Sequence, residues 1–257
     1  MKKVIAGLVL AGAAAFNANA SVIEFDDSAF GGTGSVFFDQ LDWRPDEALV
    51  TQTDTNGNGS IFFGQDDFIE FGTTRLVNFN LGPSSMMPAG YELILDYDFA
   101  GVAEAFLPPF PGFPASQTVG FTAGSATIYA DTNVNNGVID GTAIALGTLS
   151  FRVGSCFNNL NTSTGSCNIV MKFDANPGYF FYNGNDISGN NFVYSELIVT
   201  VQDIIGLSPT YNGVPGSSQD FIIPHDGNQT FTVPEPASLA ILGLGLLGLR
   251  LNRRNKN

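Results

Sequence analysis

Residues 91–99, with the sequence YELILDYDF, decide the fold class of this chain. Apolar and aromatic side chains occupy every second position from Tyr91 to Phe99, and acidic side chains fill most of the positions between them. Successive side chains of a β-strand point to opposite faces, so a period of two predicts a strand with one buried face. The same period recurs at 168–174 and 192–202, whereas nothing between residues 21 and 232 has the period of an amphipathic helix.

The remaining residues of 21–232 extend this pattern into one all-β domain. Between 142 and 153 the apolar alternation changes phase at Gly147, which predicts a β-bulge there. Turn signals such as Asn183-Gly184 and Asp226-Gly227 separate the predicted strands. About 12 short strands in a single unit predict one antiparallel β-sandwich or jelly-roll-like domain. Further strands are expected at 21–25, 35–38, 48–53, 60–64, 68–79, 117–122, 126–131, 179–182 and 228–233.

The composition excludes several classes of function. The chain has 257 residues, with 10 basic residues, 24 acidic residues and a single histidine, His225. One histidine excludes a multi-histidine metal site within the chain. The acidic excess argues against nucleic acid as a partner, because phosphate binding requires basic side chains. Within 21–236, four basic residues stand against all 24 acidic residues, a formal charge of −20, which repels polyanions and attracts cations.

The N-terminal residues 1–20 have the three parts of a secretory signal peptide. Lys2 and Lys3 form a positive region, 4–16 is an uncharged apolar stretch, and 18–20 supplies small residues for cleavage. We expect signal peptidase to cut before Ser21, so that the mature chain is exported.

The C-terminal residues 233–257 contain a short motif, an apolar stretch and a basic cluster in that order. The apolar stretch is short for a transmembrane helix, which needs about 20 residues. The basic cluster is expected to stay on the cytoplasmic side, so the exported chain would be held transiently at the inner membrane. An ordinary tail anchor is the alternative. The residues are Val233, Pro234, Glu235 and Pro236 for the motif, 237–249 for the apolar stretch, and Arg250, Arg253 and Arg254 in the basic cluster.

This three-part order resembles the PEP-CTERM sorting signal of Gram-negative bacteria. The resemblance implies recognition by exosortase, processing near the Pro-Glu-Pro motif, and release to the cell surface or the extracellular matrix. Residues 37–45, FFDQLDWRP, followed by Ala48-Leu49-Val50, further resemble an N-terminal segment of flocculation-associated PEP-CTERM proteins. That resemblance implies a role in exopolysaccharide association, in biofilm or floc formation.

Cys156 and Cys167 enclose ten residues and are the only cysteines in the sequence. An exported protein meets an oxidising compartment, so we predict that they form one disulfide.

Residues 54–61, DTNGNGSI, match the start of a calcium-binding loop. Asp54, Asn56 and Asn58 would supply oxygen ligands at alternate positions, and Gly59 would allow the tight turn. The twelfth position is Gln65 instead of Glu, and a plain hairpin turn explains the same residues. Calcium is therefore a possible cofactor and not a required one. A weaker candidate comprises Asp131, Asn133, Asn135 and Asp140, which lacks the glycine.

The catalytic signals are weak, and we expect no enzyme activity. His225 is followed by Asp226 in what reads as an exposed loop, and the chain has no Gly-x-Ser-x-Gly elbow. The main hypothesis is an exported surface or matrix protein. A calcium-assisted carbohydrate-binding module and a secreted hydrolase with a carboxylate pair remain as alternatives.

Overall fold

The computed structural model describes residues 20–59, 65–109, 111, 114–134, 137–207 and 214–234. The chain divides into two compact units, one of residues 19–232 and the other of 1–18 together with 233–257. Of the second unit, only Val233 and Pro234 are described. All of the predicted signal peptide but Ala20, and most of the sorting signal, therefore lie outside the described residues.

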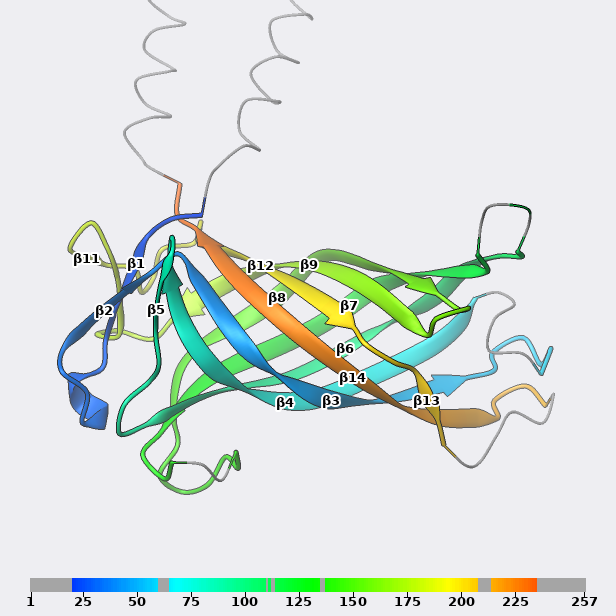
Figure 1. Cartoon of the computed structure of the whole chain (residues 1–257), viewed down its shortest axis with the longest axis horizontal. Helices are drawn as coiled ribbons and strands as arrows, with labels where there is room; N and C mark the ends of the chain where they lie inside the picture. Colours follow the sequence, from blue (N-terminus) through cyan, green and yellow to red (C-terminus); the bar gives the residue numbers. More distant parts are fainter. Residues whose placement is uncertain are drawn as a thin grey trace, which may run out of the picture. The chain divides into compact units, whose positions relative to one another are not determined.

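Eight strands of the described chain close into an antiparallel barrel (Figure 1). Each strand pairs with its neighbours in the order β3-β4-β6-β7-β8-β9-β12-β14, and β14 returns to pair with β3. The strands are β3 (Gln40–Thr53), β4 (Asp66–Leu81), β6 (Glu92–Leu107), β7 (Ser116–Asp131), β8 (Ile144–Asn159), β9 (Thr164–Ala175), β12 (Tyr194–Val201) and β14 (Ser218–Thr232).

The all-β antiparallel class was predicted correctly, but the closed barrel replaces the expected sandwich or jelly roll. The difference lies in β14, which pairs with β12 on one side and with β3 on the other and so leaves no free edge on the ring. A period of two fixes which side chains face inward, but it carries no information about this closure. Several predicted short strands are also parts of longer ones; 117–122 and 126–131 both belong to β7.

The predicted bulge at Gly147 is confirmed. The register between β7 and β8 shifts where Ile128 pairs with Gly147 and Tyr129 pairs with Ala145. A Cβ atom at Gly147 would lie 2.6 Å from the ring of Phe173, so only glycine leaves room for this packing. The bulge lets Leu146 and Leu149, which lie on opposite sides of the phase change, both be buried, whereas Ile144 is exposed.

An aromatic plug fills one end of the barrel, where β3, β6, β8 and β12 begin and the other four strands end. Its rings approach to centroid distances of 5.1–6.1 Å, and each of these side chains is at most 3% exposed. The residues of the plug are Phe25, Phe30, Phe38, Phe79, Tyr91, Phe173, Phe180 and Phe231.

A small four-stranded sheet supplies part of this plug. It has the order β11-β10-β1-β2, at the left of Figure 1, and Phe25, Phe38 and Phe180 come from it. Its strands are β1 (Ile23–Asp26), β2 (Ser35–Phe38), β10 (Phe180–Tyr182) and β11 (Asn185–Asp186), and the remaining elements are η2 (Ser28–Phe30), β5 (Ser84–Met86) and β13 (Ile205–Gly206).

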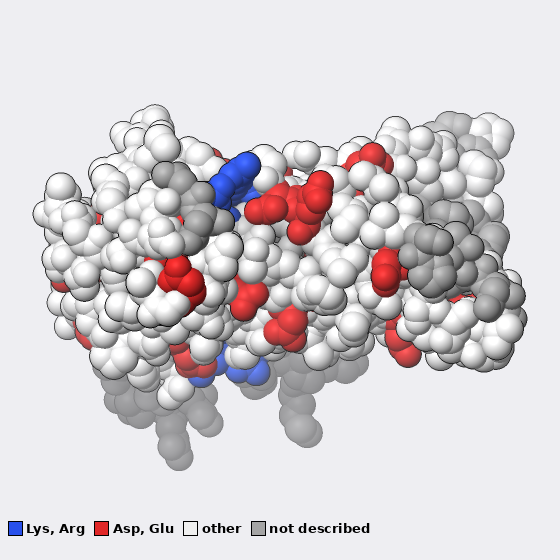
Figure 2. Space-filling model, turned by 90° about the horizontal axis from the view of Figure 1, so that it is seen from below, with Lys and Arg blue, Asp and Glu red and all other residues white. Residues whose placement is uncertain are grey.

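The outer surface carries the acidic excess expected from the sequence. Figure 2 shows acidic side chains spread over the face seen there, with basic side chains at few places. Arg75 pairs with Glu92 at 3.3 Å and Lys172 with Asp174 at 2.6 Å. Most of the acidic groups therefore contribute to a negative field around the barrel.

Candidate functional site

A cavity of about 100 Å³ lies inside the barrel, and all eight barrel strands contribute to its lining. It occupies the part of the interior that the aromatic plug leaves unfilled, toward the end where β3 and β6 finish. Apolar side chains such as Val119, Ile169 and Leu197 form most of the wall. A polar group in this wall is partly removed from water and needs a partner.

Tyr97 and His225 form a hydrogen-bonded pair in the wall, with the Tyr97 hydroxyl 2.6 Å from Nε2 of His225. Gly72 makes room for this hydroxyl, because a Cβ atom there would lie 2.5 Å from it. Burial raises the pKa of Tyr97 well above its usual value, and the nearby Glu70 and Asp46 raise it further. The tyrosine therefore keeps its proton at neutral pH.

The imidazole of His225 is neutral and has one unpaired nitrogen. Burial lowers the pKa of His225, although Asp46 and Asp226 act in the opposite direction. Nδ1 is buried without a hydrogen-bond partner. This position corrects the expectation of an exposed loop histidine, because His225 lies in β14 and is only 6% exposed.

Glu70 is the carboxyl group of the cavity wall. It lies on β4 two positions after Phe68, on the same inward face, and directly opposite Phe99 of β6. Burial raises the pKa of Glu70 to about 7, since an apolar enclosure disfavours the charged form. Glu70 is not among the site residues predicted from the sequence, although a charged residue among the inward positions of the predicted strand 68–79 is a signal that could have identified it.

A series of buried hydrogen bonds begins at Trp43, which lines the cavity. Trp43 Nε1 donates to Oε1 of Gln229 at 3.1 Å, and Gln229 Nε2 donates to the hydroxyl of Ser195 at 2.6 Å. Gln229 and Ser195 are at most 1% exposed. These partners satisfy the buried amide, so this series of hydrogen bonds serves the fold.

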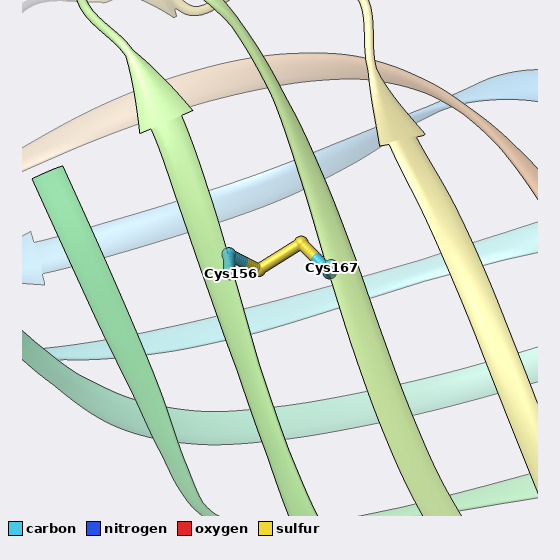
Figure 3. The surroundings of a disulfide bond; sticks show 2 residues. All are labelled: Cys156 and Cys167. Carbon is cyan, nitrogen blue, oxygen red and sulfur yellow. A yellow bond between two sulfur atoms is a disulfide. The ribbon is translucent and has the colours of Figure 1, made fainter. Parts of the chain in front are cut away.

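The predicted disulfide joins Cys156 and Cys167 (Figure 3). The two residues pair directly across β8 and β9, with Cα atoms 4.0 Å apart, and both line the cavity. A link of this kind between neighbouring strands restrains the wall and stabilises the fold by about 3 kcal/mol in the chain-entropy model.

The candidate calcium turn is held together by its own backbone. The buried carboxylate of Asp54 accepts N–H groups of Gly57, Asn58 and Gly59 at 2.7, 3.1 and 2.9 Å, and Oδ1 of Asn56 accepts from Asn58 at 2.9 Å. The structure thus brings Asp54, Asn56 and Asn58 into one turn. Among the described residues, no group of three or more acidic, histidine or cysteine side chains is arranged to hold a metal. Calcium binding here stays a prediction.

The weaker candidate loop also brings its described members together. Thr142 Oγ1 lies 2.5 Å from a carboxylate oxygen of Asp131 and 2.7 Å from one of Asp140, and Asn133 donates to Asp140 at 3.0 Å. Asn135 lies outside the described residues. One hydroxyl has a single proton, so it cannot donate to both carboxylates at once.

The comparisons with known proteins identify the C-terminal segment. Residues 232–254 match the family model of the PEP-CTERM protein-sorting motif. The chain therefore carries a PEP-CTERM sorting signal, which implies export, sorting to the surface and exosortase as the processing partner. Neither the comparison with curated proteins nor that with solved structures gave a match.

The predicted contact of this signal with the membrane stays untested by the structure. No helix among the described residues is long and apolar enough to cross a membrane, and the predicted stretch 237–249 lies outside them. The inner-membrane intermediate and the cleavage before Ser21 by signal peptidase stay predictions.

Proposed function

We propose that this protein is a non-catalytic component of the cell surface or the extracellular matrix that associates with exopolysaccharide in biofilm or floc formation. The sorting motif at 232–254 is the observation that carries the proposal, because it directs an exported chain to the surface. The disulfide suits an oxidising compartment. Membership of the flocculation-associated group is part of this proposal and rests on the segment 37–50.

An exposed strip on the outer face of the barrel supports contact with a polymer. Ile69 and Phe71 of β4 are 53% and 46% exposed, and Phe71 lies directly opposite the exposed Asp98 of β6. An aromatic ring can cover the apolar face of a sugar, while a carboxylate accepts its hydroxyl protons. Exposed apolar groups of this kind often mark binding surfaces.

The charge of the domain indicates which polymer it would bind. A formal charge of −20 over 21–236 disfavours contact with an acidic polysaccharide unless cations bridge the two. A neutral or amino-sugar polymer is therefore the preferred partner. The alternative is calcium-assisted glycan binding. It is favoured by the carboxylates of Asp131 and Asp140, which both contact the hydroxyl of Thr142 and whose negative charges a bound cation would neutralise.

A hydrolase is the less favoured alternative. Glycoside hydrolysis uses two carboxyl groups on either side of the bond that is cut. The described lining of the cavity includes one, Glu70.

Cell fractionation tests the sorting. Cells expressing the intact chain are compared with cells expressing a chain truncated before Val233. We expect the intact chain to reach the matrix without its tail and the truncated chain to miss that location. Uncleaved protein in the inner membrane would leave the tail as a simple anchor and remove the main support for the proposal.

Polysaccharide binding tests the outer strip. Phe71→Ala is expected to weaken retention on the native exopolysaccharide by about tenfold, whereas Phe192→Ala, which removes a 65% exposed ring in another part of the chain, is expected to have no effect. The same assay with calcium or a chelator tests the carbohydrate-binding alternative. Equal binding by both variants would reject the strip as the contact surface.

A further inference from the structure

We propose that the cavity of the barrel binds a small organic cation, an alkylammonium with a short apolar body, with Glu70 as the counter-charge and the neighbouring aromatic rings as the wall. This inference goes beyond the association with exopolysaccharide and does not depend on how the chain is sorted. It rests on three features of the cavity, which are its aromatic wall, its lone carboxyl group and its lack of basic side chains.

The aromatic wall consists of Phe68, Tyr97, Phe99 and Phe121. The ring centroids lie 5.7 Å apart for Tyr97 and Phe99, 5.5 Å for Phe99 and Phe121, and 5.6 Å for Phe121 and Phe68. All four residues line the cavity, and Trp43 and Phe221 bring its aromatic side chains to six. Walls of aromatic rings attract organic cations, because the faces of the rings carry partial negative charge.

Glu70 lies against this wall without a protein partner. Among the described residues, no hydrogen bond or ion pair reaches its carboxyl group, and it faces inward opposite Phe99. The side chain is enclosed by the barrel but keeps partial exposure, which the adjacent cavity provides. An enclosed carboxyl group without a donor is complementary to a cation that brings both a charge and N–H groups.

The charges around the cavity favour a cation over any other ligand. The described lining contains neither lysine nor arginine, and its titratable groups besides Glu70 are Tyr97 of β6 and His225 of β14, both neutral at pH 7. Asp46 of β3 adds a further negative charge near Tyr97 and His225. The acidic exterior raises the local concentration of cations and repels carboxylates.

The size of the cavity limits the ligand. An apolar cavity of roughly 150 Å³ holds one benzene molecule. The cavity of this barrel measures about 100 Å³, so it accommodates an occupant of about four to five non-hydrogen atoms. Butylammonium has this size, and butanol is its uncharged counterpart of equal length.

Calorimetric titration of the exported protein with butylammonium and with butanol at pH 8 tests the proposal. We expect butylammonium to bind at least tenfold more tightly than butanol. Glu70→Gln is expected to remove this preference while leaving the affinity for butanol within about twofold. The control Glu104→Gln, which removes an exposed carboxyl group outside the cavity lining, is expected to keep the preference. Equal affinities for the two ligands, or an unchanged preference in Glu70→Gln, would overturn the proposal.

A second readout uses the unmodified protein and does not depend on the folding of a variant. The pKa of Glu70 is raised to about 7, and a bound cation favours the ionised carboxylate. Butylammonium is therefore expected to release a proton from the protein on binding at pH 7, which calorimetry in two buffers of different ionisation enthalpy detects. Its affinity is expected to fall several-fold from pH 8 to pH 6. Binding without proton release and without this pH dependence would contradict a role of Glu70.

Discussion

The two ends of the barrel interior differ in how their polar groups are paired, although the same strands build both. Tyr91, the residue just before β6, belongs to the aromatic plug, and Tyr97 of β6 lies in the cavity wall. The hydroxyl of Tyr91 donates to the carboxylate of Asp27 at 3.2 Å, and the N–H of Gly34 bonds to the other oxygen of that group at 2.8 Å. Tyr97 is hydrogen-bonded to Nε2 of His225, but Nδ1 of His225 has no hydrogen-bond partner. The carboxyl group of Glu70 in the same wall also has no hydrogen-bond partner among the described residues.

This difference indicates a division of tasks within one barrel. The plug matches its polar groups and packs its rings closely, which are the requirements of a stable core. The other end keeps a cavity and unpaired polar groups, which reduce stability and are retained where a ligand can satisfy them. The predictions below test whether the two ends respond differently to equivalent changes.

Removal of a large ring is expected to give the largest effect. Phe173→Ala in the plug leaves a new cavity among close-packed rings and should lower the free energy of unfolding by about 4 kcal/mol. Phe121→Ala in the cavity wall removes a ring that already borders empty space, and the loss should be about 2 kcal/mol. Chemical denaturation of both variants measures the difference, and equal losses would mean that the cavity end is packed as tightly as the plug.

The pH dependence of stability should reveal Glu70. Its pKa is raised to about 7 in the folded chain, above the value of 4.5 of an unperturbed glutamate. The unfolded chain ionises first as the pH rises, so this group destabilises the fold progressively between pH 4.5 and about 7. At pH 8, Glu70→Gln should therefore be more stable than the unchanged protein by about 2–3 kcal/mol, and the two should converge near pH 4. A constant difference between pH 4 and pH 8 would contradict the enclosed carboxyl group.

Loss of single hydroxyl groups should give the smallest effects. Tyr91→Phe removes a hydrogen bond to a carboxylate in the plug, which should cost about 2 kcal/mol. Tyr97→Phe removes a bond between neutral groups next to a cavity, and the cost should be about 1 kcal/mol. Thermal unfolding of the two variants compares their losses of stability. A larger loss for Tyr97→Phe than for Tyr91→Phe would mean that the stronger tyrosine hydrogen bond lies at the cavity end.

The local features of the fold were accessible from the sequence. The inward face of 91–99, the bulge at Gly147 and the disulfide between Cys156 and Cys167 all follow from short-range patterns. The closure of the barrel was not accessible, because it depends on pairing between β14 and β3, which are far apart in the chain.

The cavity could not be predicted from the sequence for two reasons: its residues are far apart in the chain, and the sequence around His225 is typical of a turn. Tyr97 and His225 are 128 residues apart, and no local pattern connects them. The residues around His225 also predict a turn instead of a strand. Pro224 cannot donate a hydrogen bond to a sheet, and Asp226-Gly227 is a common turn sequence. The structure accommodates them with an irregular register between His225 and Gly227, so that β14 continues and His225 faces the interior.

The central claim is that the barrel keeps a cavity in which the enclosed carboxyl group of Glu70 can bind a cation. The most direct test is the titration of the Glu70 carboxyl carbon by nuclear magnetic resonance, with and without butylammonium. The account predicts a midpoint near pH 7 for the free protein and a clear downward shift when the cation is present. A midpoint near pH 4.5 that does not respond to the cation would contradict both the enclosed carboxyl group and the binding site built around it.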